Sequence, residues 1–225
     1  MTIFDKALKS YDTHHTKYKI NNSRIQQLIK VTNVLNKYFT FDTINSIETG
    51  GSHTWNDGMV GYYFANLSKQ TNGRFISVDI DPSIELKVPQ AYKFLDPEIE
   101  IDHITDDSIN FLKNLPFTPN LVHLDSWDVN LKNPLPSALH GWREFEAIES
   151  KMPVGSIIII DDNWYKGNWV EWVTQDGQGN SHKEIIDITY PIIGKGAHIY
   201  QWLIPGDKNW KILDTGYKII IQKQW

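Results

Sequence analysis

Acidic side chains follow five short apolar stretches of this chain, at the point where each stretch ends. The clearest case is GSIIIIDDNW, residues 155–164, in which four isoleucines are followed directly by two aspartates. Carboxylates gathered in one place can accept hydrogen bonds from a ribose diol, hold a divalent cation or accept a proton. One acid alone at such a point is ordinary turn or helix-cap chemistry, so the observation rests on the whole set. The set comprises Glu48, Asp79, Asp81, Asp106, Asp107, Asp125, Asp161 and Asp162.

The apolar stretches before these acids have the length and composition of buried strands. Helical segments alternate with them, and this alternation predicts an α/β fold with a parallel sheet covered on both faces. Right-handed crossovers would bring the carboxyl ends of the strands to one edge, where ligands bind, so we expect the acids to meet there. The expected strands span 43–50, 73–81, 98–105, 119–127 and 155–162.

Helices are predicted between these strands and before the first of them. Residues 22–38 place Ile25, Leu28 and Leu35 on one stripe, which is typical of an amphipathic helix. The end of the chain, 210–225, predicts a hairpin. The other expected helices span 56–70, 107–115 and 137–152.

The glycines after the first expected strand bear on the choice of cofactor. A dinucleotide fingerprint that begins at Gly50 would need glycines at two positions that are Ser52 and Trp55. Only Gly50 and Gly51 allow the close backbone approach that a pyrophosphate requires. An adenosyl ligand without a phosphate chain fits better, and Asp79 is placed to accept hydrogen bonds from its ribose diol.

The motifs SIETGG, FISVDIDP, HITDDSINFL, HLDSWD and GSIIIIDDN resemble, in order and spacing, the strand ends of class I S-adenosylmethionine-dependent methyltransferases. The resemblance covers roughly residues 40–165. Within that superfamily the chain is most similar to metal-dependent small-molecule O-methyltransferases of the catechol and antibiotic-sugar types. The resemblance implies a Rossmann-like three-layer sandwich, with a mostly parallel seven-stranded sheet that includes an antiparallel C-terminal hairpin strand.

The resemblance also implies which residues hold S-adenosyl-L-methionine. They come from the first loop and from the ends of the second, third and fourth strands. The matching residues are Glu48 and Gly50 for the methionine part, Asp79 for the ribose, and Asp106 and Trp127 for the adenine. Gly51 and Ser52 of the same loop are expected to bind the cofactor as well, although the loop GGSHTWNDG departs from the glycine-rich pattern of these enzymes.

Three aspartates, Asp125, Asp161 and Asp162, match the metal ligands of these methyltransferases. In the superfamily's strand order the fourth and fifth strands are neighbours, about 4.8 Å apart. Carboxylates brought that close raise one another's pKa or need a cation between them. Oxygen ligands favour Mg²⁺, which would lower the pKa of an acceptor hydroxyl and orient it. Capping, turn and substrate-binding roles stay open for all three aspartates.

The general base for that hydroxyl is an open choice. Catechol-type enzymes carry a lysine just after LD-x-W, where this chain has Asp128. The candidates are His140, His123, Asp128 and Lys195, and the preferred catalytic set is His140, Asp128 and Lys195. His140 comes first because it belongs to the helix before the fifth strand and an imidazole titrates near neutral pH. A structural role is the alternative for each histidine.

One domain is expected over residues 1–225. The first part is a lid or a homodimer contact, two alternatives between which the sequence does not choose. The expected parts are an N-terminal helical segment (1–40), a cofactor-binding core (41–165), a substrate-side cap (166–200) and a C-terminal hairpin (201–225).

Composition narrows the function classes. The 225 residues carry a net charge of −5 without a Lys and Arg cluster, which disfavours a nucleic-acid partner. Neither a membrane-spanning run nor a secretory signal is evident, so we expect a cytoplasmic enzyme with no membrane partner and a small hydroxylated substrate. The absence of cysteine excludes thiolate nucleophiles. The alternatives are a non-catalytic adenosyl-binding protein and a nucleotide-dependent oxidoreductase. The incomplete glycine fingerprint argues against the oxidoreductase.

Overall fold

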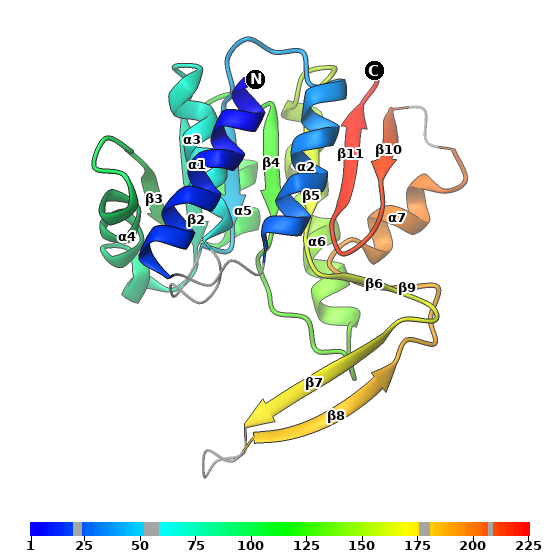
Figure 1. Ribbon diagram of the computed structural model, residues 1–225. Helices are drawn as coiled ribbons and strands as arrows, with labels where there is room; N and C mark the ends of the chain where they lie inside the picture. Colours follow the sequence, from blue (N-terminus) through cyan, green and yellow to red (C-terminus); the bar gives the residue numbers. More distant parts are fainter. Residues whose placement is uncertain (20–23, 52–58, 176–180, 207–208) are drawn as a thin grey trace.

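A seven-stranded sheet forms the centre of the molecule (Figure 1). The computed structural model describes residues 1–19, 24–51, 59–175, 181–206 and 209–225. The strand order is β10-β11-β5-β4-β1-β2-β3, in which β1 to β5 are parallel and β11 is antiparallel to both β5 and β10. The strands are β1 (Ser46–Thr49), β2 (Phe75–Asp79), β3 (Asp102–Thr105), β4 (Leu121–Leu124), β5 (Ile157–Ile160), β10 (Trp210–Asp214) and β11 (Ile219–Lys223).

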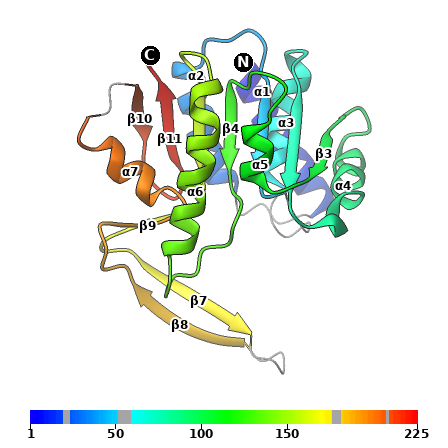
Figure 2. The ribbon, with the colours of Figure 1, turned by 180° about the vertical axis from the view of Figure 1, so that it is seen from behind.

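Helices cover both faces of this sheet, and the two sides are seen in Figures 1 and 2. Helices α1 to α4 contribute to one buried apolar cluster, and α5, α6 and α7 contribute to the other. The expected three-layer sandwich is therefore confirmed. None of the helices in the described ranges is long and apolar enough to cross a membrane. The helices are α1 (Ile3–Tyr18), α2 (Ile25–Tyr38), α3 (Val60–Gln70), α4 (Lys87–Leu95), α5 (Ser108–Lys113), α6 (Leu135–Ile148) and α7 (Ala197–Leu203).

The four isoleucines of β5 explain why an uninterrupted apolar run suits this position. Successive side chains of a strand point to opposite faces of the sheet. Ile157 and Ile159 belong to the cluster beneath α1 to α4, and Ile158 and Ile160 belong to the cluster beneath α5 to α7. All four are fully buried, so both faces of β5 must be apolar.

Helix α7 was not predicted from the sequence pattern, and it reaches Leu203, inside the range expected for the C-terminal hairpin, 201–225. Helix α4 was not predicted either. Its sequence KVPQAYKFL contains Pro89, which normally argues against a helix. Pro89 lies in the first turn, where a missing backbone N–H breaks no intrahelical hydrogen bond. Val88, Tyr92 and Leu95 are buried and attach the helix to the sheet. The third strand is also shorter than expected, since it begins only at Asp102.

The strand that precedes the cap region, residues 166–200, pairs with a strand near the end of that region, and the middle of the cap extends away. Strands β6 (Asn163–Tyr165) and β9 (Ile192–Gly194) pair antiparallel. Between them, β7 (Trp169–Gln175) and β8 (Ser181–Asp187) form a hairpin that projects from the body of the molecule (Figure 1). By contrast, the N-terminal helices α1 and α2 pack within the core.

The register of the strands aligns the residues that follow them. Thr49, Leu124 and Ile160 are the last residues of β1, β4 and β5 and lie side by side in the sheet. Asp125 and Asp161, which come next, therefore emerge as neighbours at the same edge. The antiparallel β11 begins at Ile219 beside Ile160, so Lys218 lies next to Asp161. The sheet thus delivers two acids and a lysine to one point.

Candidate functional site

A cavity of about 520 Å³ opens at the carboxyl edge of the sheet. Its volume lies within the range of small-molecule sites. Most of the site residues predicted from the sequence line it. Those that do are Glu48, Gly50, Gly51, Asp79, Asp125, Trp127, Asp128, His140, Asp162 and Lys195.

Two predicted residues are placed elsewhere, and a third lies outside the described residues. Asp161 is fully buried behind the cavity, and Asp106 is not among its described lining residues. Ser52 belongs to the range 52–58, which the structure does not describe. The neighbour of Asp106, Asp107, does line the cavity, although the motif comparison did not select it.

Gly50 joins the ends of β1 and β4 and could not carry a side chain. Its φ is +78°, and a Cβ atom there would lie 2.5 Å from the carbonyl oxygen of Asp125. Its backbone N–H donates to the Val78 carbonyl at 2.9 Å, and the Asp125 N–H donates to the Thr49 carbonyl at 3.0 Å. The three strand ends β2, β1 and β4 are thereby tied together, which fixes the floor of the cavity.

The acids beside β2 and β3 are engaged with nearby backbone. Asp79 accepts a hydrogen bond from the Asp81 N–H at 2.8 Å, and Asp81 accepts one from the Ser83 N–H at 2.8 Å. Asp107 is the N-cap of α5 and accepts from the Asn110 N–H at 2.9 Å. For Asp81 and Asp107 the turn and capping interpretation is therefore correct. All three of these acids also line the cavity.

Trp127 and His140 form an aromatic pair at the cavity. Their ring centroids lie 5.2 Å apart with an interplanar angle of 30°. Trp127 is 57% exposed and has a φ of +65°, a left-handed conformation that is uncommon for a bulky residue. Its ring therefore offers a large accessible aromatic surface to a planar ligand.

His140 takes part in a network of hydroxyl and carboxylate groups. Its Nε2 lies 2.9 Å from Ser126 Oγ and 3.1 Å from Ser108 Oγ. Ser126 Oγ donates to Oε1 of the buried Glu144 at 2.6 Å. Since the single hydroxyl proton of Ser126 points to Glu144, Nε2 of His140 carries a proton and donates to Ser126. The nitrogen able to accept a proton in that tautomer is Nδ1.

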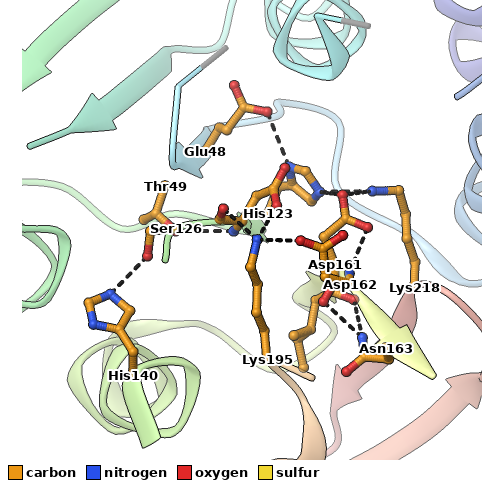
Figure 3. A network of polar contacts seen from close by, with 12 residues as sticks. Glu48, Thr49, His123, Ser126, His140, Asp161, Asp162, Asn163, Lys195 and Lys218 are labelled. Carbon is orange, nitrogen blue, oxygen red and sulfur yellow. Dashed lines mark hydrogen bonds and ion pairs between the residues drawn. The ribbon is translucent and has the colours of Figure 1, made fainter. Parts of the chain in front are cut away.

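A second network of buried charges crosses four neighbouring strands (Figure 3). Glu48 Oε1 lies 3.1 Å from Nδ1 of His123, whose Nε2 lies 3.1 Å from Nζ of Lys218. Lys218 donates to Oδ2 of Asp161 at 2.6 Å. All four side chains are buried. Despite burial, Lys218 and His123 hold the pKa of Asp161 well below its usual value, so this carboxyl is ionised. Among the described residues, His123 does not reach the cavity.

Lys195 lies between the two aspartates that do face the cavity. Its Nζ lies 2.5 Å from Oδ1 of Asp125. The same Nζ lies 2.8 Å from Oδ2 of Asp162, as Figure 3 shows. Burial opposes the ammonium charge, but the Asp125 and Asp162 carboxylates raise the pKa of Lys195 above its usual value. Burial, partly offset by Lys195, raises the pKa of Asp125 to about 6. A neutral Lys195 that accepts a proton is therefore disfavoured near neutral pH.

Arg24 and Tyr217, which the motif comparison did not select, complete this cluster. The Tyr217 hydroxyl donates to Oδ1 of Asp162. The Arg24 guanidinium lies 5.3 Å from the centroid of the Tyr217 ring, and its Nη1 lies 3.9 Å from Oδ2 of Asp161. Arg24 also lines the cavity. Three acids, two lysines and one arginine therefore meet at the ends of β4, β5 and β11.

The fit of a divalent cation to this cluster can be judged from its donor atoms. Ligand atoms of His123, Asp125 and Asp161 all lie within 4.8 Å of one another, which would suit a metal. However, Lys218 contacts both His123 and Asp161, and Lys195 contacts Asp125. A Mg²⁺ ion at about 2.1 Å from these oxygens would lie against both ammonium groups. As arranged, the side chains do not fit the metal.

Comparisons with known proteins agree on the fold. No protein-family model matches the sequence, and no curated protein is similar to it. Among solved structures, the MycE methyltransferase of the mycinamycin pathway, in complex with Mg and SAH, superposes with a TM-score of 0.58 and 15% identity over 96% of this chain and 55% of its own. SAH-bound PaMTH1 from Podospora anserina superposes with a TM-score of 0.55 and 11% identity, over 100% of this chain and 88% of its own. An rRNA methylase from Streptococcus thermophilus superposes with a TM-score of 0.50 and 13% identity, over 86% of this chain and 93% of its own.

These identities are low, so the likenesses establish the fold alone. The chain has the fold of class I S-adenosylmethionine-dependent methyltransferases, as the resemblance implied. The three similar structures include both a biosynthetic-pathway methyltransferase and an rRNA methylase. The fold therefore does not choose an acceptor.

Proposed function

We propose that this chain is an S-adenosylmethionine-dependent methyltransferase that methylates a hydroxyl group of a small molecule, a sugar or a phenol. The observation that carries the proposal is the cavity at the carboxyl edge of the sheet. Glu48 and Asp79 line it from the ends of β1 and β2, and Asp125 and Asp162 line it after β4 and β5. A net charge of −5 disfavours a nucleic-acid acceptor.

The cofactor half of this proposal assigns each part of S-adenosylmethionine to a group at the cavity. Glu48 Oε2 is buried and has no hydrogen-bond partner among the described residues, so it can accept a bond from the methionine ammonium. The Asp79 carboxylate, at the end of β2, can accept bonds from the ribose diol. The exposed face of Trp127 can stack on the adenine.

The chemical step is an in-line displacement. The acceptor oxygen forms a bond to the methyl carbon as the bond from that carbon to sulfur breaks, and the sulfonium becomes the neutral thioether of S-adenosylhomocysteine. The hydroxyl proton passes to a base on the protein. His140 and Asp128 are the candidates for that base because both line the cavity. Lys195 is held as an ammonium, so we assign it a positioning role rather than that of a base.

Magnesium is the second cofactor that the resemblance implies, and the MycE structure contains it. When bound between aspartates, it would polarise the acceptor hydroxyl. In this chain Lys195 and Lys218 already contact the oxygens that would hold it. No step of the proposed reaction is therefore assigned to the metal.

Calorimetric titration with S-adenosylhomocysteine tests the cofactor assignment. The wild-type protein is expected to bind, and Asp79→Asn is expected to weaken binding by about ten- to a hundredfold, because one charge-assisted hydrogen bond contributes about 1.5–3 kcal/mol. Asp102→Asn is the matched control, since Asp102 pairs with Arg74 on the exposed start of β3. Equal affinity in Asp79→Asn and in the wild type would remove Asp79 from the site.

The acceptor is tested with radiolabelled S-adenosylmethionine against a panel of sugars and phenols. Transfer of label to a hydroxylated small molecule supports the proposal. Cofactor binding without transfer to any acceptor, small molecule or RNA, would favour the non-catalytic adenosyl-binding alternative. Transfer to RNA alone would overturn the small-molecule assignment.

A further inference from the structure

We propose that the side chains of Lys195 and Lys218 take the place of the divalent cation, so that methyl transfer by this chain is independent of metal. This inference rests on the proposed methyltransferase function. It departs from the metal-dependent enzymes that the sequence resembles. The argument depends on where the two lysines are held and on what their ammonium groups contact.

The backbone of Lys195 is held tightly in place. A Cβ on the preceding Gly194, whose φ is +119°, would lie 1.9 Å from the Asp162 carbonyl oxygen. On the other side, a Cβ on Gly141 of α6 would lie 2.3 Å from the Lys195 carbonyl oxygen. The Gly196 N–H donates to Oδ1 of the buried Asn163 at 2.8 Å. The chain therefore passes the site too closely for Lys195 to be displaced without disturbing β9 and α6.

The ammonium groups find their hydrogen-bond acceptors within the site. Lys195 is 2% exposed, and its Nζ contacts the Asp125 carbonyl oxygen at 2.7 Å as well as the carboxylates of Asp125 and Asp162. Three acceptors match the three N–H groups of an ammonium. Lys218, which is 6% exposed, contacts Asp161 and His123. Each of the three aspartates therefore has a lysine partner.

Charge balance supports the same conclusion. Asp125, Asp161 and Asp162 carry three negative charges, and Lys195, Lys218 and Arg24 carry three positive charges. A divalent cation added to these six balanced charges would leave two positive charges in excess among them, in a largely buried site. Uncompensated buried charge is strongly destabilising. A metal would bind only if a lysine left, and a buried lysine without its partner is itself unfavourable.

The fixed ammonium of Lys195 keeps Asp125 and Asp162 in one geometry at the cavity. Preorganised polar groups of this kind orient a ligand without the rearrangement that water or a loose side chain would need. The acceptor hydroxyl is then oriented by protein groups alone, and its proton must leave to a protein base.

Binding of Mn²⁺ alone, followed by electron paramagnetic resonance, tests the proposal without any need for turnover. The wild-type protein is expected to leave the Mn²⁺ signal unchanged up to millimolar concentration. Lys195→Met frees the Asp125 and Asp162 carboxylates and is expected to bind Mn²⁺ at least about tenfold more tightly. Lys183→Met, which breaks an exposed ion pair with Glu171 on the hairpin, is the control and should behave as the wild type.

Two further variants keep the test decisive if Lys195→Met folds poorly. Lys195→Arg retains the positive charge and should gain no Mn²⁺ site. Asp125→Asn in the wild-type background should leave Mn²⁺ binding absent. Micromolar Mn²⁺ binding by the wild type that is lost in Asp125→Asn would overturn the proposal.

Titration with S-adenosylhomocysteine separates the two proposals. Binding of both S-adenosylhomocysteine and Mn²⁺ by the wild-type protein would support the methyltransferase function. It would contradict the proposal that Lys195 and Lys218 take the place of the metal. Protein that binds neither ligand would reject the function on which the inference rests. Cofactor binding that is unchanged by EDTA, without Mn²⁺ binding, supports both.

Discussion

The acids at the ends of β2 and β3 and those at the ends of β4 and β5 occupy similar positions in the fold but have different partners. Asp81 and Asp107 accept hydrogen bonds from backbone N–H groups within three residues of them. Asp125 and Asp161 pair with lysines that lie 70 and 57 residues away in the sequence. The first group stabilises local turns, whereas the second depends on the whole sheet and holds together four strands and the cap. The same residue type at the same kind of position therefore has two distinct roles.

The largest effect that would sharpen this contrast is expected from Lys218→Met. This change leaves Asp161 buried and ionised without its ammonium partner, and breaking a buried pair costs about 3–5 kcal/mol. Lys69→Met is the control, because Lys69 pairs with Asp96 and Glu98 at a partly exposed site and should cost no more than about 1 kcal/mol. Urea denaturation measures both losses. Equal losses would mean that the buried cluster contributes no more than a surface pair.

A smaller effect, on affinity, is expected from Trp127→Ala. A stacked aromatic ring contributes about 0.5–1.5 kcal/mol to the free energy of binding. Its removal should therefore weaken binding of S-adenosylhomocysteine by up to about tenfold. The free energy of unfolding should change little because the ring is largely exposed. Trp169→Ala on the exposed hairpin is the matched control and should leave affinity unchanged. Unaltered calorimetric affinity in Trp127→Ala would place the adenine elsewhere.

The smallest effect concerns the local acids and is expected from Asp107→Ala. Removing an N-cap carboxylate costs about 1 kcal/mol of stability. Asp106→Ala should cost less, because Asp106 accepts from the exposed Asn110 side chain and from the Asp107 N–H. Thermal unfolding compares the two variants. If instead Asp106→Ala weakened cofactor binding while Asp107→Ala did not, Asp106 would have the adenine contact that the motif comparison implied.

The sequence allowed the sheet and its polar edge to be predicted because those features depend on local patterns. The isoleucine run of β5 is apolar on both faces, and this alone indicated a buried strand with acids at its end. No helix was predicted over Lys87–Leu95, although the proline in its first turn is compatible with a helix.

The partners of the aspartates could not be predicted from those patterns. Lys218 meets Asp161 only because β11 pairs antiparallel with β5 in one register, and sequence spacing does not determine that register. Lys195 reaches Asp125 through the close packing of Gly194 and Gly196. One signal was present in the sequence: a lysine begins the apolar run of β11, and aspartates end the apolar run of β5. Antiparallel pairing of the two runs brings opposite charges together.

The most direct test of the account is calorimetric titration of the wild-type protein with S-adenosylhomocysteine, once with Mg²⁺ and once with EDTA. The account predicts binding with the same affinity in both conditions, because the cofactor groups at Glu48 and Asp79 and the lysine-paired aspartates need no added metal. Absence of binding in both conditions would contradict the proposed function. Binding that requires Mg²⁺ would contradict the proposal that Lys195 and Lys218 take the place of the metal.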